Sequence, residues 1–196
     1  MTYQRYMVLD LGASDDLVRV VDRALVAAGN ASGHTFEYNA SAPSDTGIVL
    51  HSWSAAGESM ARVTVADDHS MPARYLLLEA DDQAAYRAID EALADNLLIV
   101  SFEELKRRAT RPGAPPASLT QMGLGAGPVP DPEAIRIIVR GLESNERDVV
   151  DAAVMAASLT RWGAFVPVLR RVQAVTSDEG IARMAAQALI DCGGLP

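Results

Sequence analysis

Histidine, cysteine and paired aspartates are the residue types in this chain that could perform catalysis or bind a metal. The three histidines fall one per segment, without the paired spacing of a zinc or iron site; they are His34, His51 and His69. The aspartate pairs at 67–68 and 81–82 could act as acid and base, but a turn and a helix start explain them more simply. Cys192 has no basic neighbour to activate its thiol. We therefore predict no catalytic residue, no cofactor and no metal site.

Recognition of another protein is the second chemistry to consider, and its candidates lie in the C-terminal third. Trp162 and Phe165 are large aromatic residues at a predicted turn, where each either fills a core or anchors a partner. We favour the core for Phe165, and both alternatives stay open for Trp162. Three arginines could form a basic stripe, although a solvated face neutralised by acidic neighbours explains them more simply; they are Arg140, Arg170 and Arg171. The partner-binding candidates are therefore Trp162 and these three arginines.

The elements that carry these candidates form a sequence repeat. Residues 131–193 match themselves when shifted by about 30 residues, a period typical of stacked helical repeats. The shift aligns Ile138 with Val168 and Gly163 with Gly193. Each copy predicts a helical hairpin that buries its apolar face on its neighbour. The four predicted helices cover about 132–143, 146–161, 164–175 and 178–191.

The second copy, GIARMAAQALIDCG, resembles a HEAT-like repeat of the short bacterial type, through Ile181, Leu189 and the closing Gly193. The first copy matches through Ala156 and Leu159. The resemblance covers about 60 of the 196 residues. It implies an all-α, two-repeat domain that binds proteins, and it supplies no catalytic residue. Because repeat arrays normally need at least three units, we expect the two hairpins to pack on the N-terminal domain, on a second chain or on a partner.

Residues 1–109 combine strand and helix patterns. A strand is predicted over 3–11, and Ser14 is expected to cap a helix that ends near Gly29. Short strand candidates separated by turn residues follow over 35–39, 47–53, 61–66 and 74–80. The later elements are expected to be a helix from Asp81, a strand over 97–100 and a short helix over 102–109. This order predicts an α+β sandwich with the helices on one face of an antiparallel sheet.

The segment 110–130 separates the two predicted domains. It holds five prolines and four glycines without usable periodicity, so we predict an interdomain linker. Its MGLGAG stretch resembles a phosphate-binding loop, but no strand precedes it and no Lys-Ser/Thr follows it. The predicted organisation is an α+β domain over 1–109, a linker over 110–130 and HEAT-like repeats over 131–196.

Charge and composition limit the function classes. The formal net charge is -9, and residues 1–109 hold 17 acidic against 9 basic groups. This balance disfavours nucleic-acid binding and suits a basic protein partner, although acidity also simply keeps a protein soluble. A single cysteine excludes an internal disulfide, and we find neither a membrane span nor the layout of a signal peptide. A cytoplasmic protein is expected.

These patterns favour a non-enzymatic protein-binding scaffold or adaptor over an enzyme. A specific version is a bacterial immunity-type or regulatory protein whose acidic surface occludes a basic partner. The alternative is a small-ligand binder or enzyme with a pocket between the α+β domain and the repeats. The chain could also pair with a second copy to form a homodimer.

Overall fold

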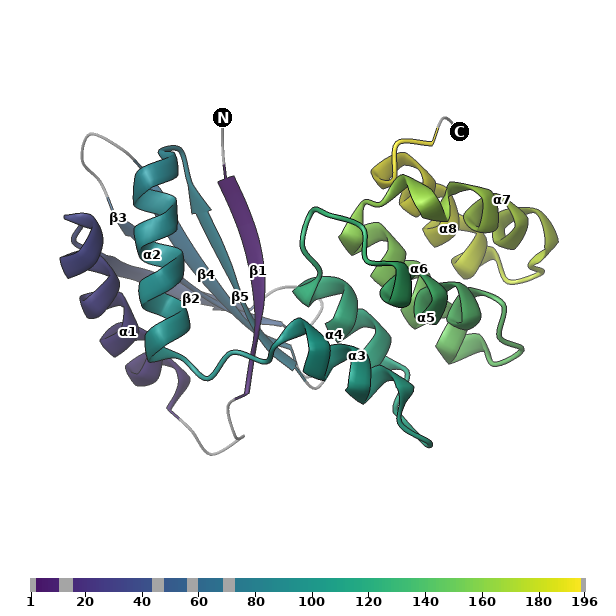
Figure 1. Cartoon of the computed structure of the whole chain (residues 1–196), viewed down its shortest axis with the longest axis horizontal. Helices are drawn as coiled ribbons and strands as arrows, with labels where there is room; N and C mark the ends of the chain where they lie inside the picture. Colours follow the sequence, from purple (N-terminus) through teal and green to yellow (C-terminus); the bar gives the residue numbers. More distant parts are fainter. Residues whose placement is uncertain (1–2, 11–15, 44–47, 56–59, 69–72, 195–196) are drawn as a thin grey trace. The chain divides into compact units, whose positions relative to one another are not determined.

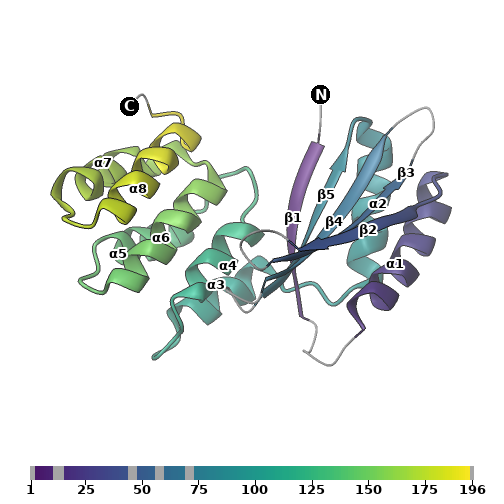
Figure 2. The ribbon, with the colours of Figure 1, turned by 180° about the vertical axis from the view of Figure 1, so that it is seen from behind.

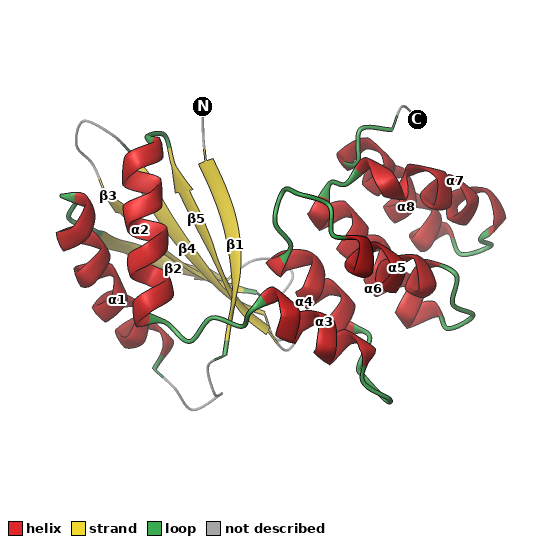
Figure 3. Cartoon of the chain, in the orientation of Figure 1, coloured by secondary structure: helices red, strands yellow, loops and turns green. Residues whose placement is uncertain are grey.

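The computed structural model describes residues 3–10, 16–43, 48–55, 60–68 and 73–194 (Figure 1). The chain forms two compact units, Met1–Val100 (unit 1) and Ser101–Pro196 (unit 2). Strands occur in unit 1 and are absent from the described part of unit 2, as Figure 3 shows. The predicted α+β fold class is therefore confirmed.

Unit 1 is built on a five-stranded sheet in which every neighbouring pair is antiparallel. Its strands are β1 (Tyr3–Leu9), β2 (Glu37–Pro43), β3 (Val49–Ala55), β4 (Ala61–Asp68) and β5 (Ala73–Ala80). The order across the sheet is β1-β5-β4-β3-β2, so β2 to β5 form a meander and β1 pairs with the last strand. Short turn-rich connections allow only antiparallel neighbours in such a meander, as the sequence predicts.

Two helices, α1 (Leu17–Ser32) and α2 (Gln83–Asn96), lie side by side on one face of the sheet (Figures 1 and 2). Alternate strand residues point toward them, because side chains on a strand have a period of two. Val63, Leu76 and Leu78 are fully buried with Leu25 of α1 and Ile89 of α2. Each such side chain contributes about 1.5–3 kcal/mol by leaving water.

The ends of these elements differ in detail from the sequence expectations. Asp16 caps α1 by accepting a hydrogen bond from the Arg19 amide at 3.1 Å, whereas Ser14 lies outside the described residues. Asp82 caps α2 in the same way, through the Ala85 amide at 2.7 Å. The strand predicted over 97–100 is reduced to one bridge between Ile99 and Leu9.

Unit 2 contains three helical hairpins where the sequence predicts two. The hairpins are α3 (Phe102–Thr110) with α4 (Ala117–Gly125), α5 (Pro132–Leu142) with α6 (Arg147–Thr160), and α7 (Val166–Val175) with α8 (Glu179–Asp191). A single 3₁₀ turn, Gly163–Phe165, precedes α7. Helices α4, α6 and α8 form one layer in which neighbours contact each other, and α3, α5 and α7 form the other. The third hairpin supplies the additional unit that a two-repeat array lacks.

The structure differs from the predicted linker over 110–130, because residues 117–125 form the buried helix α4. Its glycines serve close packing: a Cβ on Gly123 would lie 2.7 Å from Cα of Ala156 on α6. A Cβ on Gly125 would lie 2.2 Å from the Leu105 side chain of α3. The boundary between the units accordingly falls after Val100, and α3 belongs to unit 2. Glycines make a segment flexible only where no other residue packs against them. Whether a distant residue does so cannot be read from the sequence.

Helix capping in unit 2 follows the predicted pattern at α5 and departs from it at α8. Asp131 accepts from the Ala134 amide at 2.8 Å, with Pro132 at the first helical position. The sequence predicts a capping box between Thr176 and Glu179, but Asp178 caps α8 instead. Its carboxylate accepts from the amides of Gly180 and Ile181, while the Thr176 hydroxyl accepts from the Asp178 amide at 3.2 Å.

Candidate functional site

The structural boundary concentrates the net charge in unit 1. Residues 1–100 hold 15 acidic against 6 basic side chains, whereas residues 101–196 hold 11 of each. The formal charge of unit 1 is therefore -9 and that of unit 2 is zero. Any long-range attraction of a charged partner originates in unit 1.

Many of the charged groups of unit 2 pair with one another and hold its hairpins together. Arg147 on α6 contacts Asp178 at the start of α8 at 2.6 Å. Arg171 on α7 contacts Glu143, the residue after α5, at 2.7 Å. Both bridges join consecutive hairpins, so these groups stabilise the array and are less available to a partner.

Lys106 is the most enclosed cation of unit 2. Its side chain is 7% exposed, and its ammonium lies 2.8 Å from Glu103, 3.0 Å from Glu133 and 3.3 Å from Asp131. The hydrogen bond to Glu103 raises the pKa of Lys106 above its ordinary range against the opposing effect of burial, and Glu133 and Asp131 add to the rise. The hydrogen bond from Ala134, helped by Lys106, lowers the pKa of Asp131. Through these ion pairs Lys106 links α3 to the start of α5.

The structure separates the four partner-binding candidates predicted from the sequence. Trp162 is 3% exposed, donates a hydrogen bond from Nε1 to the Gly127 carbonyl at 3.1 Å, and stacks on Phe165 with ring centroids 6.0 Å apart. Both aromatic residues therefore belong to the core, and the indole of Trp162 is not a surface anchor. Arg140 and Arg170 are exposed on the neighbouring helices α5 and α7, and Arg171 is engaged with Glu143.

The described histidines have different surroundings and do not converge. His51 lies on β3 and its Nδ1 is 3.1 Å from the Tyr38 hydroxyl, while His34 lies 3.0 Å from the Ser32 carbonyl after α1. His69 lies outside the described residues. Across the described ranges, no group of three His, Cys, Asp or Glu side chains is placed to hold a metal ion.

Cys192 is expected to be a slow nucleophile. Its thiol is buried and donates to the Ala157 carbonyl at 3.4 Å, and burial together with Asp191 raises its pKa to about 11. At pH 8 the thiolate fraction should fall about 100-fold below that of an ordinary cysteine. Iodoacetamide alkylation followed by mass spectrometry should show protection in buffer and rapid modification in urea. Equal alkylation rates in buffer and in urea would contradict a buried Cys192 thiol.

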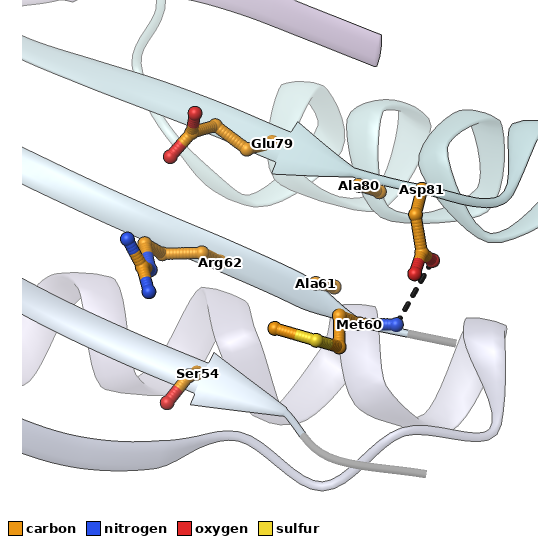
Figure 4. Close-up of a pocket in the computed structure, with 7 residues that line it drawn as sticks. All are labelled: Ser54, Met60, Ala61, Arg62, Glu79, Ala80 and Asp81. Atoms are coloured by element: carbon orange, nitrogen blue, oxygen red, sulfur yellow. Dashed lines mark hydrogen bonds between the residues drawn. The ribbon is translucent and has the colours of Figure 1, made fainter. Parts of the chain in front are cut away.

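The face of the sheet opposite the helices carries a polar row across its strands. Gln4 of β1 donates to Glu79 of β5 at 2.8 Å, and Asn39 of β2 donates to Ser54 of β3 at 2.7 Å. Arg62 of β4 lies between these two pairs, opposite Glu79 on one side and Ser54 on the other (Figure 4). No described residue makes a hydrogen bond or ion pair with the guanidinium of Arg62. Its donors remain available to a binding partner.

A hollow of about 320 Å³ opens at the end of this row, between β4, β5 and the start of α2. Its frame is rigid, because the Met60 amide donates to the Asp81 carboxylate at 2.9 Å and the Asp81 amide to the Met60 carbonyl at 3.2 Å (Figure 4). The Met60 side chain is 64% exposed beside Arg62. Methionine and arginine are both enriched at protein interfaces. A shallow hollow with these groups suits contact with a protein surface better than enclosure of a small substrate.

Sequence reasoning placed Arg62 on a strand but did not single it out. The alternation of Ala61, Val63 and Val65 with polar residues could have assigned Arg62 to the solvent face. Its position between Glu79 and Ser54 depends on strand register, which joins residues far apart in the chain.

Comparisons with known proteins add no family to this description. Every helix among the described residues is too short or too polar to cross a bilayer. No family model, curated protein or solved structure matches the chain.

Proposed function

We propose that this chain is a non-enzymatic protein-binding module that holds a basic protein through unit 1. The observation that carries the proposal is the concentration of the whole formal charge of -9 in residues 1–100. Complementary potentials accelerate encounter and suppress partners of the wrong charge. A regulatory protein of the immunity type, which occludes a basic effector, would use such a surface.

Several carboxylates of unit 1 are already engaged within it and contribute less to a partner. Both oxygens of Asp90 accept from Nη1 of Arg5, at 2.8 and 2.7 Å, and Asp67 pairs with Arg74 at 3.2 Å. Other carboxylates are exposed and have no hydrogen-bond or ion-pair partner in the described ranges; they include Glu37 on β2 and Glu91 and Asp95 on α2. These groups lie on both sides of the sheet and contribute to the negative field that a basic protein would meet.

The three-hairpin array of unit 2 supports the scaffold part of the proposal. Stacked hairpins form extended surfaces whose shape is fixed by the contacts between neighbours. In this chain the neighbouring hairpins are in close contact at Gly123 and are also joined by the surface ion pairs of Arg147 and Arg171. Arg140 and Arg170 on its α3-α5-α7 layer stay candidates for contacts to acidic groups of a partner.

Neutralising exposed carboxylates in unit 1 is expected to weaken partner binding more than the same change in unit 2. The test variant is E37Q/E91Q/D95N, and the matched control is E146Q/D148N/E179Q, whose carboxylates are also exposed. Both variants change the net charge by three. Full-length proteins should be used to capture partners from native lysate at low and high salt, with quantitative mass spectrometry.

We expect wild type to retain a basic protein at low salt and lose it at high salt. The unit 1 variant should retain at least fivefold less of that protein than the unit 2 control. A captured partner that is acidic, or whose retention does not change with salt, would overturn the proposal. If both variants lost the same amount of captured partner, unit 1 would not be the binding surface.

A further inference from the structure

A second hollow in unit 1 lies on the helix side of the sheet, between the C-terminal half of α1 and the segment that enters β2. Its volume is about 250 Å³, and the residues that matter for its chemistry are Asp22, Val26, Asn30, His34, Phe36 and Trp53. This volume is below the roughly 300–1,000 Å³ range of sites for drug-sized ligands. The hollow is therefore suited to a single side chain.

An exposed carboxylate, that of Asp22, lies at the rim of the hollow and bonds to the indole of Trp53. Trp53 is 1% exposed on β3, and its Nε1 donates to Asp22 Oδ1 at 2.6 Å. This bond fixes the orientation of the carboxylate, and the described residues provide no partner for its second oxygen. Asp22 thus offers a preorganised acceptor at the rim of a hollow lined by both apolar and polar residues.

The hollow has apolar groups on part of its wall, together with the polar residues Asn30, His34 and Thr35. Val26, one turn after Asp22 on α1, is 66% exposed, and Phe36 is half-buried on the opposite side. The chain reverses after α1 through Gly33, whose φ of 74° favours glycine. The His34 amide then donates to the Gly29 carbonyl at 3.1 Å. A Cβ on Gly29 would lie 2.5 Å from the His34 carbonyl oxygen, so this close approach requires glycine.

We propose that this hollow is the subsite for a lysine side chain of the basic protein partner. The inference rests on the proposed function and names the place where the partner is anchored. The methylene stem would lie along Val26 and Phe36, and the ammonium would bind the second carboxylate oxygen of Asp22. Lysine combines these two requirements, since its stem is apolar and its charge is at the tip.

The geometry favours lysine over arginine. A guanidinium binds a carboxylate best through two parallel hydrogen bonds, one to each oxygen. In this hollow Oδ1 already accepts the short bond from Trp53, which leaves one oxygen for the strongest contact. A compact ammonium needs only that one oxygen.

The test uses the full chain with hexalysine and hexaarginine peptides as probes. Affinity is measured by isothermal titration, and the indole Nε1–H signals are followed by ¹H–¹⁵N NMR, with the Trp53→Phe variant used only to assign them. The main variant is Asp22→Asn, whose amide oxygen can still accept from Trp53 while the charge is lost. Glu146→Gln is the matched control, because it removes one charge from an exposed residue of unit 2, outside the hollow and outside the acidic unit.

We expect hexalysine to shift the Trp53 indole signal and to bind about fivefold more weakly to Asp22→Asn, with less than a twofold change for Glu146→Gln. Hexaarginine is expected to bind Asp22 less tightly than hexalysine does. Salt-sensitive hexalysine binding that leaves the Trp53 signal unmoved and weakens equally in both variants would overturn the subsite and leave the proposed function intact. Absence of salt-sensitive binding to either peptide would instead count against the proposed function itself.

Discussion

Replacing Gly123 by alanine is expected to lower the free energy of unfolding of unit 2 by about 3 kcal/mol. The new Cβ would lie 2.7 Å from Cα and 2.8 Å from the carbonyl oxygen of Ala156. Both contacts are to backbone, which cannot rotate away as a side chain can, so α4 and α6 would have to separate. The helix propensity of alanine favours the substitution by only about 1 kcal/mol. The cost of the steric clash exceeds the gain in helix propensity, so the substitution is expected to destabilise unit 2.

Gly127→Ala is the matched control, because an added Cβ there meets nothing within 4 Å. Its effect should stay within about 0.5 kcal/mol. Urea unfolding followed by circular dichroism measures both variants, and the Trp162 environment reports on unit 2 separately. If Gly123→Ala were as stable as Gly127→Ala, the segment 117–125 would behave as the flexible linker that its composition predicts.

Replacing Lys106 by methionine is expected to cost about 2 kcal/mol of stability. The substitution keeps an apolar stem but leaves the carboxylates of Glu103, Asp131 and Glu133 facing one another without their cation. Asp131 also caps α5, so its capping geometry loses one of its supports. Arg107→Met is the control, since Arg107 is 69% exposed and its surface pair with Glu104 is expected to contribute little.

The pH dependence of the stability difference between wild type and Lys106→Met gives a second test of the interactions of Lys106 with its three carboxylates. Because the pKa of Asp131 is lowered in the folded chain, its contribution is complete above its unfolded pKa of about 4 and is lost as the pH falls further. The gap between wild type and Lys106→Met should therefore shrink in acid. A gap that stayed constant from pH 7 to pH 3 would show that the cost arises from packing alone.

Local sequence patterns predicted most of the elements and little of their assembly. The strands of unit 1, both of its helices and the α5-to-α8 hairpins were expected from periodicity, capping residues and turns, and the structure contains them. The α+β fold class followed from their order. Helix α4 was missed because its glycines and neighbouring prolines break periodicity, and because its buried residues, which include Ser118 and Thr120, do not form a single apolar stripe.

The candidate sites were predicted less well, for an identifiable reason. Trp162 was assigned to a turn correctly, but its burial depends on Phe165 and on the Gly127 carbonyl, 35 residues away in the chain. The Asp22 and Trp53 pair joins a helix to a strand 31 residues later. No periodic pattern in the sequence predicts either contact. Residue type alone therefore does not separate an anchor from a core residue.

The sequence by itself determined the charge of the chain, the alternation that gives the sheet its buried face and the period that builds the helical hairpins. These properties are local, because each depends on residues within a few positions of one another. The tertiary structure alone decided that Gly123 is a packing residue, that Trp162 is covered and that Asp22 meets Trp53. Those outcomes depend on which distant segments lie against each other. Protein interiors are packed so closely that the presence or absence of a single methyl group matters there.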